Sequence, residues 1–390
     1  MEIEPLAVPL GPGALALLPR LATALDGGSP VLPYAATAPP PLMPPYLRSS
    51  LPEGLAIAVG TSGSTGTPKR ALLTASALRA SARGTHERLG GPGRWLLALP
   101  AHHVAGLQVL LRSLAAGTDP VAMDLVDGFT PREFVAATRR LAPEGRCYTA
   151  LVPTQVVRLL GDPAATEALR GYDAVLVGGA ALPPTLRRAA SAAGVALVAT
   201  YGMSETAGGC VYDGLPLPGT TVRLDDEGRV HLGGDTLAAG YLSRPDLDHR
   251  AFHRDPDGTR WFRTDDVGHV DADGRLHVDG RVDDLVNTGG MKVAPRLVEE
   301  AVVAHVPGVR EVVVVGTPDP EWGQAVSALV VPAPGAPEDS LTLTRVRAHL
   351  RGILPDHALP HRVLVAGEVP LAGPGKPDRR AVAALFDVGG

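Results

Sequence analysis

Three lysines mark the parts of this sequence whose chemistry is easiest to interpret. Lys69, Lys292 and Lys376 are the only lysines, and the rest of the 36 basic residues are arginines. Each lies in a stretch with glycine or proline: TSGSTGTPKR, TGGMKVAP and GPGKPDRRA. Because lysine carries a compact, mobile ammonium group where arginine carries a broad planar fork, these positions are candidates for functional cations. Chance retention of a few lysines is the alternative.

The stretch from Gly60 to Lys69 follows an apolar segment and has the composition of an anion-binding loop. Its glycines let backbone N–H groups converge on a phosphate, and its Ser and Thr hydroxyls add donors. A flexible linker is the alternative, but linkers seldom follow a buried strand and end in Pro-Lys. The spacing also differs from Walker A, which is GxxxxGK followed by Ser or Thr. We predict phosphate contacts from Thr61, Ser62, Gly63, Ser64, Thr65, Gly66 and Lys69.

Length and composition exclude several classes of protein. A chain of 390 residues is too long for one small core and predicts two or more domains. A net charge of −5 gives no field that attracts nucleic acid or an anionic membrane. Cys147 and Cys210 lie far apart and predict neither a disulfide framework nor a zinc site. With acids at the N-terminus and no apolar run as long as a membrane span, we expect a soluble cytoplasmic protein.

Short apolar runs alternate with amphipathic stretches between residues 55 and 202. The apolar runs at 54–60, 94–100, 120–124, 147–152, 173–179 and 196–202 are typical of buried strands. Helices are predicted over 104–117 and 130–141, the second with Thr130 as N-cap and Glu133 completing a capping box. Strands that alternate with helices predict an α/β fold with a mainly parallel sheet, covered on both faces.

The pattern changes after Gly202. The segments 220–234 and 268–280 each place an acidic residue and a glycine between alternating runs, which predicts antiparallel hairpins. The predicted elements that follow are a helix over 295–305, strands at 311–316 and 327–333, and a helix near 342–353. We predict an N-terminal domain over 1–280 with a β-rich part at about 208–280, a hinge at 281–284, and a C-terminal domain over 285–390.

Four further motifs, in order along the chain, carry a resemblance to a known family. They are YGMSET (201–206), WFRTDD (261–266), GRVDD (280–284) and GKPDR (375–379). With the loop at 60–69, they resemble the acyl-adenylate-forming superfamily of acyl-CoA synthetases, luciferases and adenylation domains. The resemblance implies a large N-terminal domain of mainly parallel sheets flanked by helices, with a β-rich subdomain, and a small mobile α+β C-terminal domain. Two features depart from the family pattern: Asp265 stands where glycine is usual, and barely sixty residues precede the loop.

The first of these motifs implies the magnesium and phosphate contacts. Glu205 would bind Mg²⁺, which prefers one or two carboxylates with phosphate oxygens and waters. Thr206 would offer its hydroxyl to the α-phosphate, and Tyr201 would pack on adenine beside Gly202. A helix-start cluster at residues 204–206 and a core position for Tyr201 are the alternatives.

Three other stretches would complete the nucleotide site. Asp266 would accept hydrogen bonds from the ribose hydroxyls, and Arg281 would contact the same sugar. A turn-capping Asp266 and a plain ion pair of Arg281 are the alternatives. Adenine or an acyl group would approach the backbone of Gly178, Gly179 and Ala180, where glycine leaves space. An ordinary strand-to-helix turn would have the same sequence.

The C-terminal motifs imply catalysis and thiol transfer. Lys376 would bridge the attacking carboxylate and the α-phosphate, where a positioned cation stabilises the developing charge. Asp283 would lie in the hinge, since ATP chemistry and thiol transfer need different residues to face one substrate. Gly289, Gly290 and Lys292 would then shape the CoA tunnel. The alternatives are a solvated loop lysine at 376 and a surface ion pair at 292.

Other stretches of the sequence bear on the identity of the acid and of the thiol that accepts the acyl group. No phosphopantetheine-attachment domain follows the last motif, so we expect CoA as a free thiol acceptor. The segments 99–117 and 151–160, on this short scaffold, resemble o-succinylbenzoate–CoA ligases of menaquinone biosynthesis, whose substrate is an aryl dicarboxylate. The candidates for contacts to this acid are His102, His103, Arg112, Gln155 and Arg158. Family position favours His102 or His103, and the choice between them stays open.

Two alternative functions remain at this point. One is a CoA ligase for another aryl or short acyl acid. The other is a nucleotide-binding protein that has lost catalysis, which the retained Lys376 and Glu205 oppose because a binder needs neither. The expected small molecules are ATP with Mg²⁺, the acid and CoA. We expect no nucleic acid or membrane partner, and a homodimer is one option for the assembly.

Overall fold

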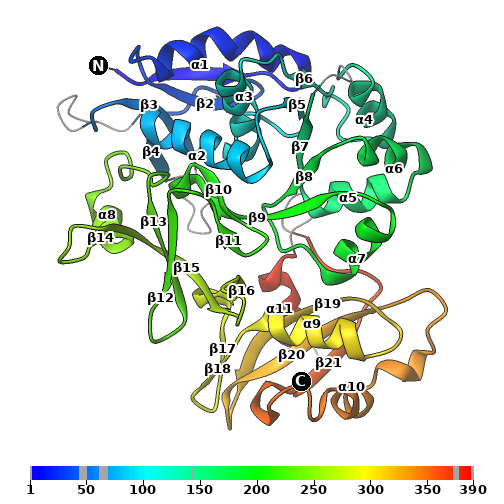
Figure 1. Ribbon diagram of the computed structural model, residues 1–390. Coiled ribbons are helices and arrows are strands. Elements are labelled where there is room, and N and C mark those ends of the chain that lie inside the picture. The colour runs from blue at the N-terminus through cyan, green and yellow to red at the C-terminus, as the bar shows by residue number, and fades with distance from the viewer. Residues whose placement is uncertain (1, 44–50, 61–68, 142–144, 372–376, 388–390) are drawn as a thin grey trace. The chain divides into compact units, whose positions relative to one another are not determined.

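Figure 1 shows the computed structural model, which describes residues 2–43, 51–60, 69–141, 145–371 and 377–387. The chain forms two compact units. Unit 1 consists of Met1–Arg223, His231–Thr264 and Asp271–Leu276. Unit 2 consists of Leu224–Val230, Asp265–Val270 and His277–Gly390, so the chain enters it three times. Every helix in the described ranges is too short or too polar to cross a bilayer.

Unit 1 is built on a seven-stranded sheet. Its order is β11 (Leu215–Pro216), β10 (Gly208–Tyr212), β9 (Leu197–Met203), β8 (Ala174–Val177), β7 (Cys147–Leu151), β5 (Arg94–Leu97) and β6 (Val121–Ala122). The strands from β9 to β6 are parallel, and β10 and β11 are added antiparallel at one edge. The expectation of a mainly parallel sheet is confirmed, and its parallel strands coincide with five of the six predicted apolar runs, all but 54–60.

Helices cover both faces of this sheet. On β5, Trp95 and Leu97 belong to a core shared with α2 (Ala75–Arg88) and α3 (Val104–Ala116), whereas Leu96 belongs to a second core. The helices of the second core are α4 (Pro131–Thr138), α5 (Pro153–Leu160), α6 (Pro163–Arg170) and α7 (Pro184–Ala192). Successive side chains of a strand point to opposite faces, so β5 contributes to both cores. The expected cap of α4 is present, since Thr130 Oγ1 accepts from the Glu133 N–H at 3.2 Å.

The N-terminal region forms a second sheet that the sequence did not reveal. Its order is β1 (Glu4–Val8), β2 (Val31–Ala35), β3 (Leu55–Gly60) and β4 (Arg70–Thr74), with α1 (Leu18–Leu25) between β1 and β2. A single sheet over residues 55–202 was therefore too simple an expectation, because β3 pairs antiparallel with β4. An apolar run shows that a strand is buried but not which strand is its neighbour. In the sequence, the predicted phosphate-binding stretch 60–69 lies between these two paired strands.

The expected hairpin turns form in a third sheet. Its order is β12 (Thr220–Leu224), β13 (Arg229–Gly234), β15 (Arg260–Val270) and β14 (Phe252–Arg254), and β16 (Leu276–Arg281) pairs with β15. Gly228 and Gly274 occupy the turns, both at φ +75°. Their N–H groups donate to the carbonyls of Asp225 at 2.9 Å and Asp271 at 3.0 Å. Glycine supplies this left-handed backbone without the steric penalty of a side chain.

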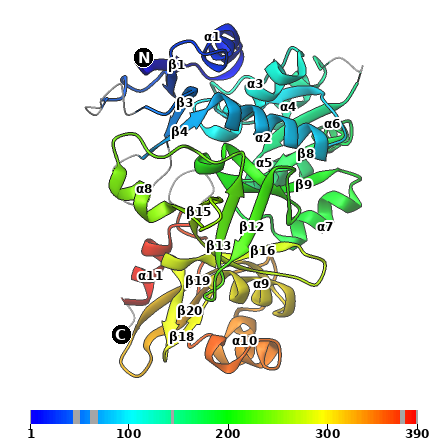
Figure 2. The same ribbon diagram turned by 60° about the vertical axis from the view of Figure 1, so that its left-hand side comes forward.

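Unit 2 contains a five-stranded sheet. Its order is β18 (Met291–Val293), β17 (Val286–Thr288), β20 (Gly323–Pro332) and β19 (Val309–Asp319), with β21 (Arg362–Val365) paired to β20. Figure 2 shows α9 (Pro295–His305) and α10 (Leu343–Leu350) on one side of it and α11 (Arg379–Asp387) on the other. Val314 packs in the α9–α10 core, whereas Val313 and Val315 share a core with Val382 of α11. The bounds of α9 are those predicted from the sequence.

Candidate functional site

The segment between β9 and β10 forms a rigid turn that buries a carboxylate. It contains a short 3-10 turn, Ser204–Thr206, followed by Ala207 in the left-handed conformation at φ 52°. Thr206 holds the turn, because its Oγ1 accepts from the Met203 N–H at 3.0 Å and donates to the Gly208 carbonyl at 2.7 Å. Glu205 and Thr206 are 8% and 0% exposed. The Thr206 hydroxyl thus serves the turn, and its contact with a phosphate stays a prediction.

Close backbone approach explains two of the glycines singled out in the sequence. A Cβ at Gly202 would lie 2.2 Å from the Gly208 carbonyl oxygen, and one at Gly178 would lie 2.4 Å from Thr200 Oγ1. Both distances are far below van der Waals contact, so strand pairing at β8, β9 and β10 requires glycine there. Gly179, at φ +77°, then turns the chain out of β8, and Ala180 after it is exposed.

Tyr201 lies on β9, half-buried, and is paired in register with Val211 of β10. This strand leads directly into the turn that carries Glu205. The structure therefore brings Tyr201, Gly202 and Glu205 together at the end of one central strand. Stacking of Tyr201 on adenine stays a prediction.

Tyr241 is a site residue that the sequence analysis missed. Its hydroxyl donates to Oε1 of Glu205 at 2.7 Å, and the Lys69 ammonium lies 5.8 Å from the centre of its ring. Tyr241 is itself 5% exposed. It lies between the buried carboxylate and the cation that ends the predicted phosphate loop. The sequence signal was a tyrosine after glycine in AAGYLSRP, which is equally typical of a core position.

His102 and His103 lie at the start of α3, where His103 is the N-cap residue. Their ring centres are 4.2 Å apart, with His102 half-buried and His103 exposed. Burial, and then the adjacent imidazole of His103, lower the pKa of His102 to about 4. His102 is therefore neutral near pH 7. Within the described part of the chain its Nδ1 is buried without a hydrogen-bond partner, so it can accept or donate one bond to a ligand without carrying charge.

Gln155 and Arg158, two of the candidate contacts for the acid, are engaged in the fold. Gln155 Oε1 accepts from the Val152 N–H at 3.0 Å, and its Nε2 donates to the Ala98 carbonyl at 3.1 Å. These bonds tie the start of α5 to the end of β5. Arg158 Nη1 lies 3.4 Å from the Phe129 carbonyl oxygen. Both side chains have structural contacts, and a contact of either one with the acid stays a prediction.

Arg112 is a cation within the core of unit 1, at 3% exposed. Its Nη2 donates to the Tyr212 hydroxyl at 3.2 Å, and its guanidinium carbon lies 5.1 Å from the centre of the Trp95 ring. Stacking on an aromatic face compensates part of the cost of burying the charge. Burial, and then this charge, lower the pKa of the neighbouring His86 to about 4.

Three acids surround Arg281 in unit 2. Its Nη2 lies 3.4 Å from both Asp265 and Asp283, and Asp265 also pairs with Arg229 at 2.6 Å. Burial lowers the pKa of Arg281, but the charges of Asp266, Asp265 and Asp283 outweigh it and raise that pKa overall. The unusual Asp265 thus forms ion pairs with two arginines. The expected ion pair of Arg281 is present, and its contact and that of Asp266 with ribose stay predictions.

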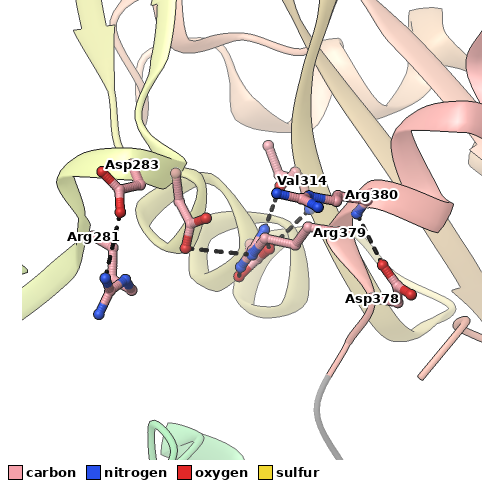
Figure 3. A network of polar contacts seen from close by, with 8 residues as sticks. Arg281, Asp283, Val314, Asp378, Arg379 and Arg380 are labelled. Carbon is pink, nitrogen blue, oxygen red and sulfur yellow. Dashed lines mark hydrogen bonds and ion pairs between the residues drawn. The ribbon is translucent and has the colours of Figure 1, made fainter. Parts of the chain in front are cut away.

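Figure 3 shows a second ionic network, around Arg379 at the start of α11. Arg379 Nη1 lies 2.9 Å from Glu299 Oε1 on α9, and it also donates to the Val314 carbonyl of β19. Its Nε lies 3.9 Å from Asp284, next to the predicted hinge residue Asp283. The network therefore joins the end of the GKPDR motif to the segment after β16.

Glycines and an exposed lysine mark the predicted CoA region. Gly289 (φ +58°) packs under the Trp322 ring, since a Cβ there would lie 2.7 Å from Trp322 Cε3, and Gly290 follows at φ +81°. Lys292 Nζ lies 3.3 Å from Glu227, with both side chains mostly exposed. The surface ion pair expected as the alternative for Lys292 is thus present, and such pairs contribute little stability.

The remaining predicted contacts, Thr61 to Gly66 and Lys376, lie outside the described residues. Among the residues that the structure does describe, no cluster of three or more His, Cys, Asp or Glu could hold a metal by itself. A metal site built on Glu205 would therefore need oxygen ligands from a bound phosphate and from water.

The chain matches two family models. Residues 19–242 match the AMP-binding enzyme model, and residues 298–376 match the AMP-binding enzyme C-terminal domain. The chain is 44% identical over 384 residues to a probable 2-succinylbenzoate–CoA ligase of Mycobacterium tuberculosis, covering 98% of each chain.

Solved structures with the same fold include two bacterial proteins. Apo MatB from Rhodopseudomonas palustris aligns with a TM-score of 0.77 and 23% identity, over 98% of this chain and 88% of that one. Wild-type E. coli MenE, with a bound phenylether-linked analogue of OSB-AMS, aligns with a TM-score of 0.73 and 25% identity, over 100% of this chain and 89% of that one. These likenesses confirm the adenylating α/β fold expected from the sequence.

Proposed function

Because this chain belongs to the AMP-binding enzyme family, we propose that it is an ATP-dependent acid–CoA ligase whose acid is 2-succinylbenzoate. The reaction would convert 2-succinylbenzoate, ATP and CoA to 2-succinylbenzoyl-CoA, AMP and diphosphate, a step of menaquinone biosynthesis. The observation that carries the proposal is the similarity to a ligase of this name along the full length of both chains. The buried carboxylate, tyrosine and lysine of unit 1 support the nucleotide chemistry.

The reaction has two steps. In the first, a carboxylate oxygen of the acid attacks the α-phosphorus, and diphosphate leaves with the electron pair of the broken P–O bond. In the second, the CoA thiol gives up its proton to solvent and its sulfur attacks the acyl carbon, and AMP leaves with the electron pair of the broken acyl C–O bond. Lys69 and Lys376 are proposed to offset the charge that develops on the phosphates, since catalysis of phosphoryl-type displacement is mostly positioning and electrostatics.

Glu205 fits the proposed role of magnesium ligand. Its carboxylate is buried, and it is oriented by the 2.7 Å hydrogen bond from Tyr241. Mg²⁺ binds readily to one carboxylate when phosphate oxygens and waters complete its shell. When bound, the ion would neutralise part of the charge of the ATP phosphates.

The proposed acyl site begins at the His102–His103 pair. A neutral His102 can bond to a carboxylate or ketone oxygen through an N–H without the desolvation cost of a cation. Its half-buried ring, whose Nδ1 has no hydrogen-bond partner within the described residues, favours it over the exposed His103. Gln155 stays a secondary candidate because its polar atoms bond to the backbone.

Unit 2 is proposed to bind ribose through Asp266 and Arg281 and CoA near Gly289, Gly290 and Lys292. Asp283 is the proposed hinge residue, and its side chain is 67% exposed, in a short 3-10 turn. A cytoplasmic location and a homodimer stay predictions as well.

A panel of aryl and dicarboxylic acids with ATP, Mg²⁺ and CoA tests the substrate assignment, with the thioester identified by its mass. We expect thioester from 2-succinylbenzoate, and diphosphate release that depends on added acid. Turnover of a simple benzoate but not of 2-succinylbenzoate would instead support a ligase for another acid. ATP binding without any acid-dependent diphosphate would support a binding protein, and phosphate release without acid would indicate an ordinary NTPase.

A further inference from the structure

The segment 238–242 ties together the two stretches of unit 1 that carry Lys69 and Glu205. Three backbone hydrogen bonds of 2.8 to 2.9 Å pair it antiparallel with β4, which begins directly after Lys69. A fourth, of 2.8 Å, runs from the Ala238 N–H to the carbonyl of Glu205. The backbone therefore fixes β4, directly after Lys69, relative to the turn at 204–206.

Tyr241 is held in this segment from several sides. Its N–H donates to Asp248 Oδ1 at 2.7 Å, and its ring centre lies 5.8 Å from that of Phe252. Arg260 Nη1 donates to the carbonyl of Ala238 at 2.6 Å. Because these contacts are all within the protein, the direction of the tyrosine hydroxyl is set before any ligand binds.

We propose that Tyr241 is a positioning residue that orients the Glu205 carboxylate toward the metal of Mg²⁺–ATP and sets its spacing from Lys69. The inference rests on the proposed function, since it takes Glu205 as the metal ligand. The hydroxyl faces Glu205 and the ring faces Lys69, so one side chain contacts both the anion and the cation that are proposed to bind the phosphates. Residues that orient a metal ligand by hydrogen bonding typically contribute about 10- to 100-fold in metal affinity or activity.

Tyr241→Phe separates the contribution of the hydroxyl from that of the ring, because it removes the hydroxyl and keeps the ring. Calorimetric titration with ATP, in Mg²⁺ and again in EDTA, measures how much the metal increases ATP affinity. In Tyr241→Phe we expect this increase to fall by about tenfold or more, while ATP affinity in EDTA stays within about twofold of wild type. Tyr241→Leu removes the ring as well and should weaken ATP binding in EDTA too, because Lys69 loses its aromatic neighbour.

Tyr172→Phe is the matched control. Tyr172 is also buried, at 4% exposed, and its hydroxyl pairs with Thr138 at 2.8 Å in the core of unit 1. The same chemical change there should leave both titrations as in wild type. Adding Tyr241→Phe to Glu205→Gln should weaken Mg²⁺–ATP binding no further than Glu205→Gln alone, since the two residues act through one contact.

Three results would overturn the proposal. Mg²⁺ could increase ATP affinity as much in Tyr241→Phe as in wild type, or Tyr241→Phe could lose as much ATP affinity in EDTA as in Mg²⁺. The third is an ATP affinity of the wild type that is the same with and without Mg²⁺. Additive losses in the double variant would do the same. The titrations contain neither acid nor CoA. A failure of acid-dependent diphosphate release in the wild type would therefore count against the proposed ligase and leave this readout intact.

Discussion

Arg379 and Glu299 form a two-point ion pair in unit 2, with 2.9 and 3.4 Å between their nitrogen and oxygen atoms. The same carboxylate accepts from the Val314 N–H at 2.8 Å. Glu299 therefore connects α9, β19 and the first residue of α11 through one side chain. Arg379 follows the proposed catalytic Lys376 by three positions, and this pair fixes the position of the last residue of the GKPDR motif.

Breaking this pair should destabilise unit 2. Arg379→Ala or Glu299→Ala leaves the partner charge partly buried, at 18 to 30% side-chain exposure, and should cost about 2–4 kcal/mol. Denaturant unfolding measures the loss. Arg380→Ala changes the exposed neighbour and should stay within about 0.5 kcal/mol of wild type. Equal effects of Arg379→Ala and Arg380→Ala would show that the pair does not matter for stability.

Lys376→Ala should separate the two half-reactions. The proposed lysine acts while charge develops at the α-phosphate, so adenylation should fall by at least about 100-fold. Thioester formation from a preformed acyl-adenylate should change little. Isotope exchange between diphosphate and ATP measures the first step, and stopped assays with synthetic adenylate measure the second. An equal loss in both steps would contradict this role.

His102→Ala should weaken binding of the acid in particular. The neutral imidazole is proposed to contact the acyl substrate, so the KM for the acid should rise about tenfold while the KM for ATP stays nearly constant. Steady-state kinetics with each substrate varied in turn give both constants. His103→Ala, at the exposed neighbour, is the control. A rise in the KM for ATP instead would place the pair on the nucleotide side.

Folding stability should fall in mild acid because of His86. Its pKa is lowered from 6.5 to about 4 in the fold, so between these values the unfolded chain binds a proton that the folded chain does not. The contribution of His86 to the free energy of unfolding is therefore largest above about pH 6.5. It decreases as the pH falls toward 4, by at most about 3 kcal/mol. Urea unfolding at pH 7 and pH 5 should show a smaller difference in His86→Gln. His102 acts in the same direction and remains in that variant, so a residual slope is expected.

Gly202→Ala should strain the turn that carries Glu205. A Cβ there would overlap the Gly208 carbonyl at 2.2 Å, so the backbone must shift at a cost of about 2–4 kcal/mol. Gly117→Ala is the matched control, because Gly117 has φ +65° but nothing within 4 Å of an added Cβ. That change should cost about 1 kcal/mol. Thermal unfolding of the two variants compares the destabilisation caused by steric overlap at Gly202 with that caused by a positive φ alone at Gly117.

The sequence predicted where strands and helices lie better than it predicted which strands pair with each other. Runs such as 147–152 became strands, and α9 starts and ends where its pattern does, because burial and helix periodicity are local signals. The pairing of β3 with β4 was not predictable, since it depends on contacts between distant segments. The family motifs singled out Glu205 and Arg281 as candidates, and their roles toward ATP stay predictions. Tyr241 escaped notice because its role depends on a hydrogen bond to a residue 36 positions away.

Unit 2 is not one continuous stretch of chain, and this affects any exchange of C-terminal halves between relatives. Asp265, on an early passage of the chain through unit 2, pairs with Arg281 on the last one. Arg229, on the first passage, pairs with the same acid. A chimera joined at residues 281–284 would take Arg281 from one parent, and Asp265 and Arg229 from the other. Grafts that also carry 224–230 and 265–270 would keep these charges matched.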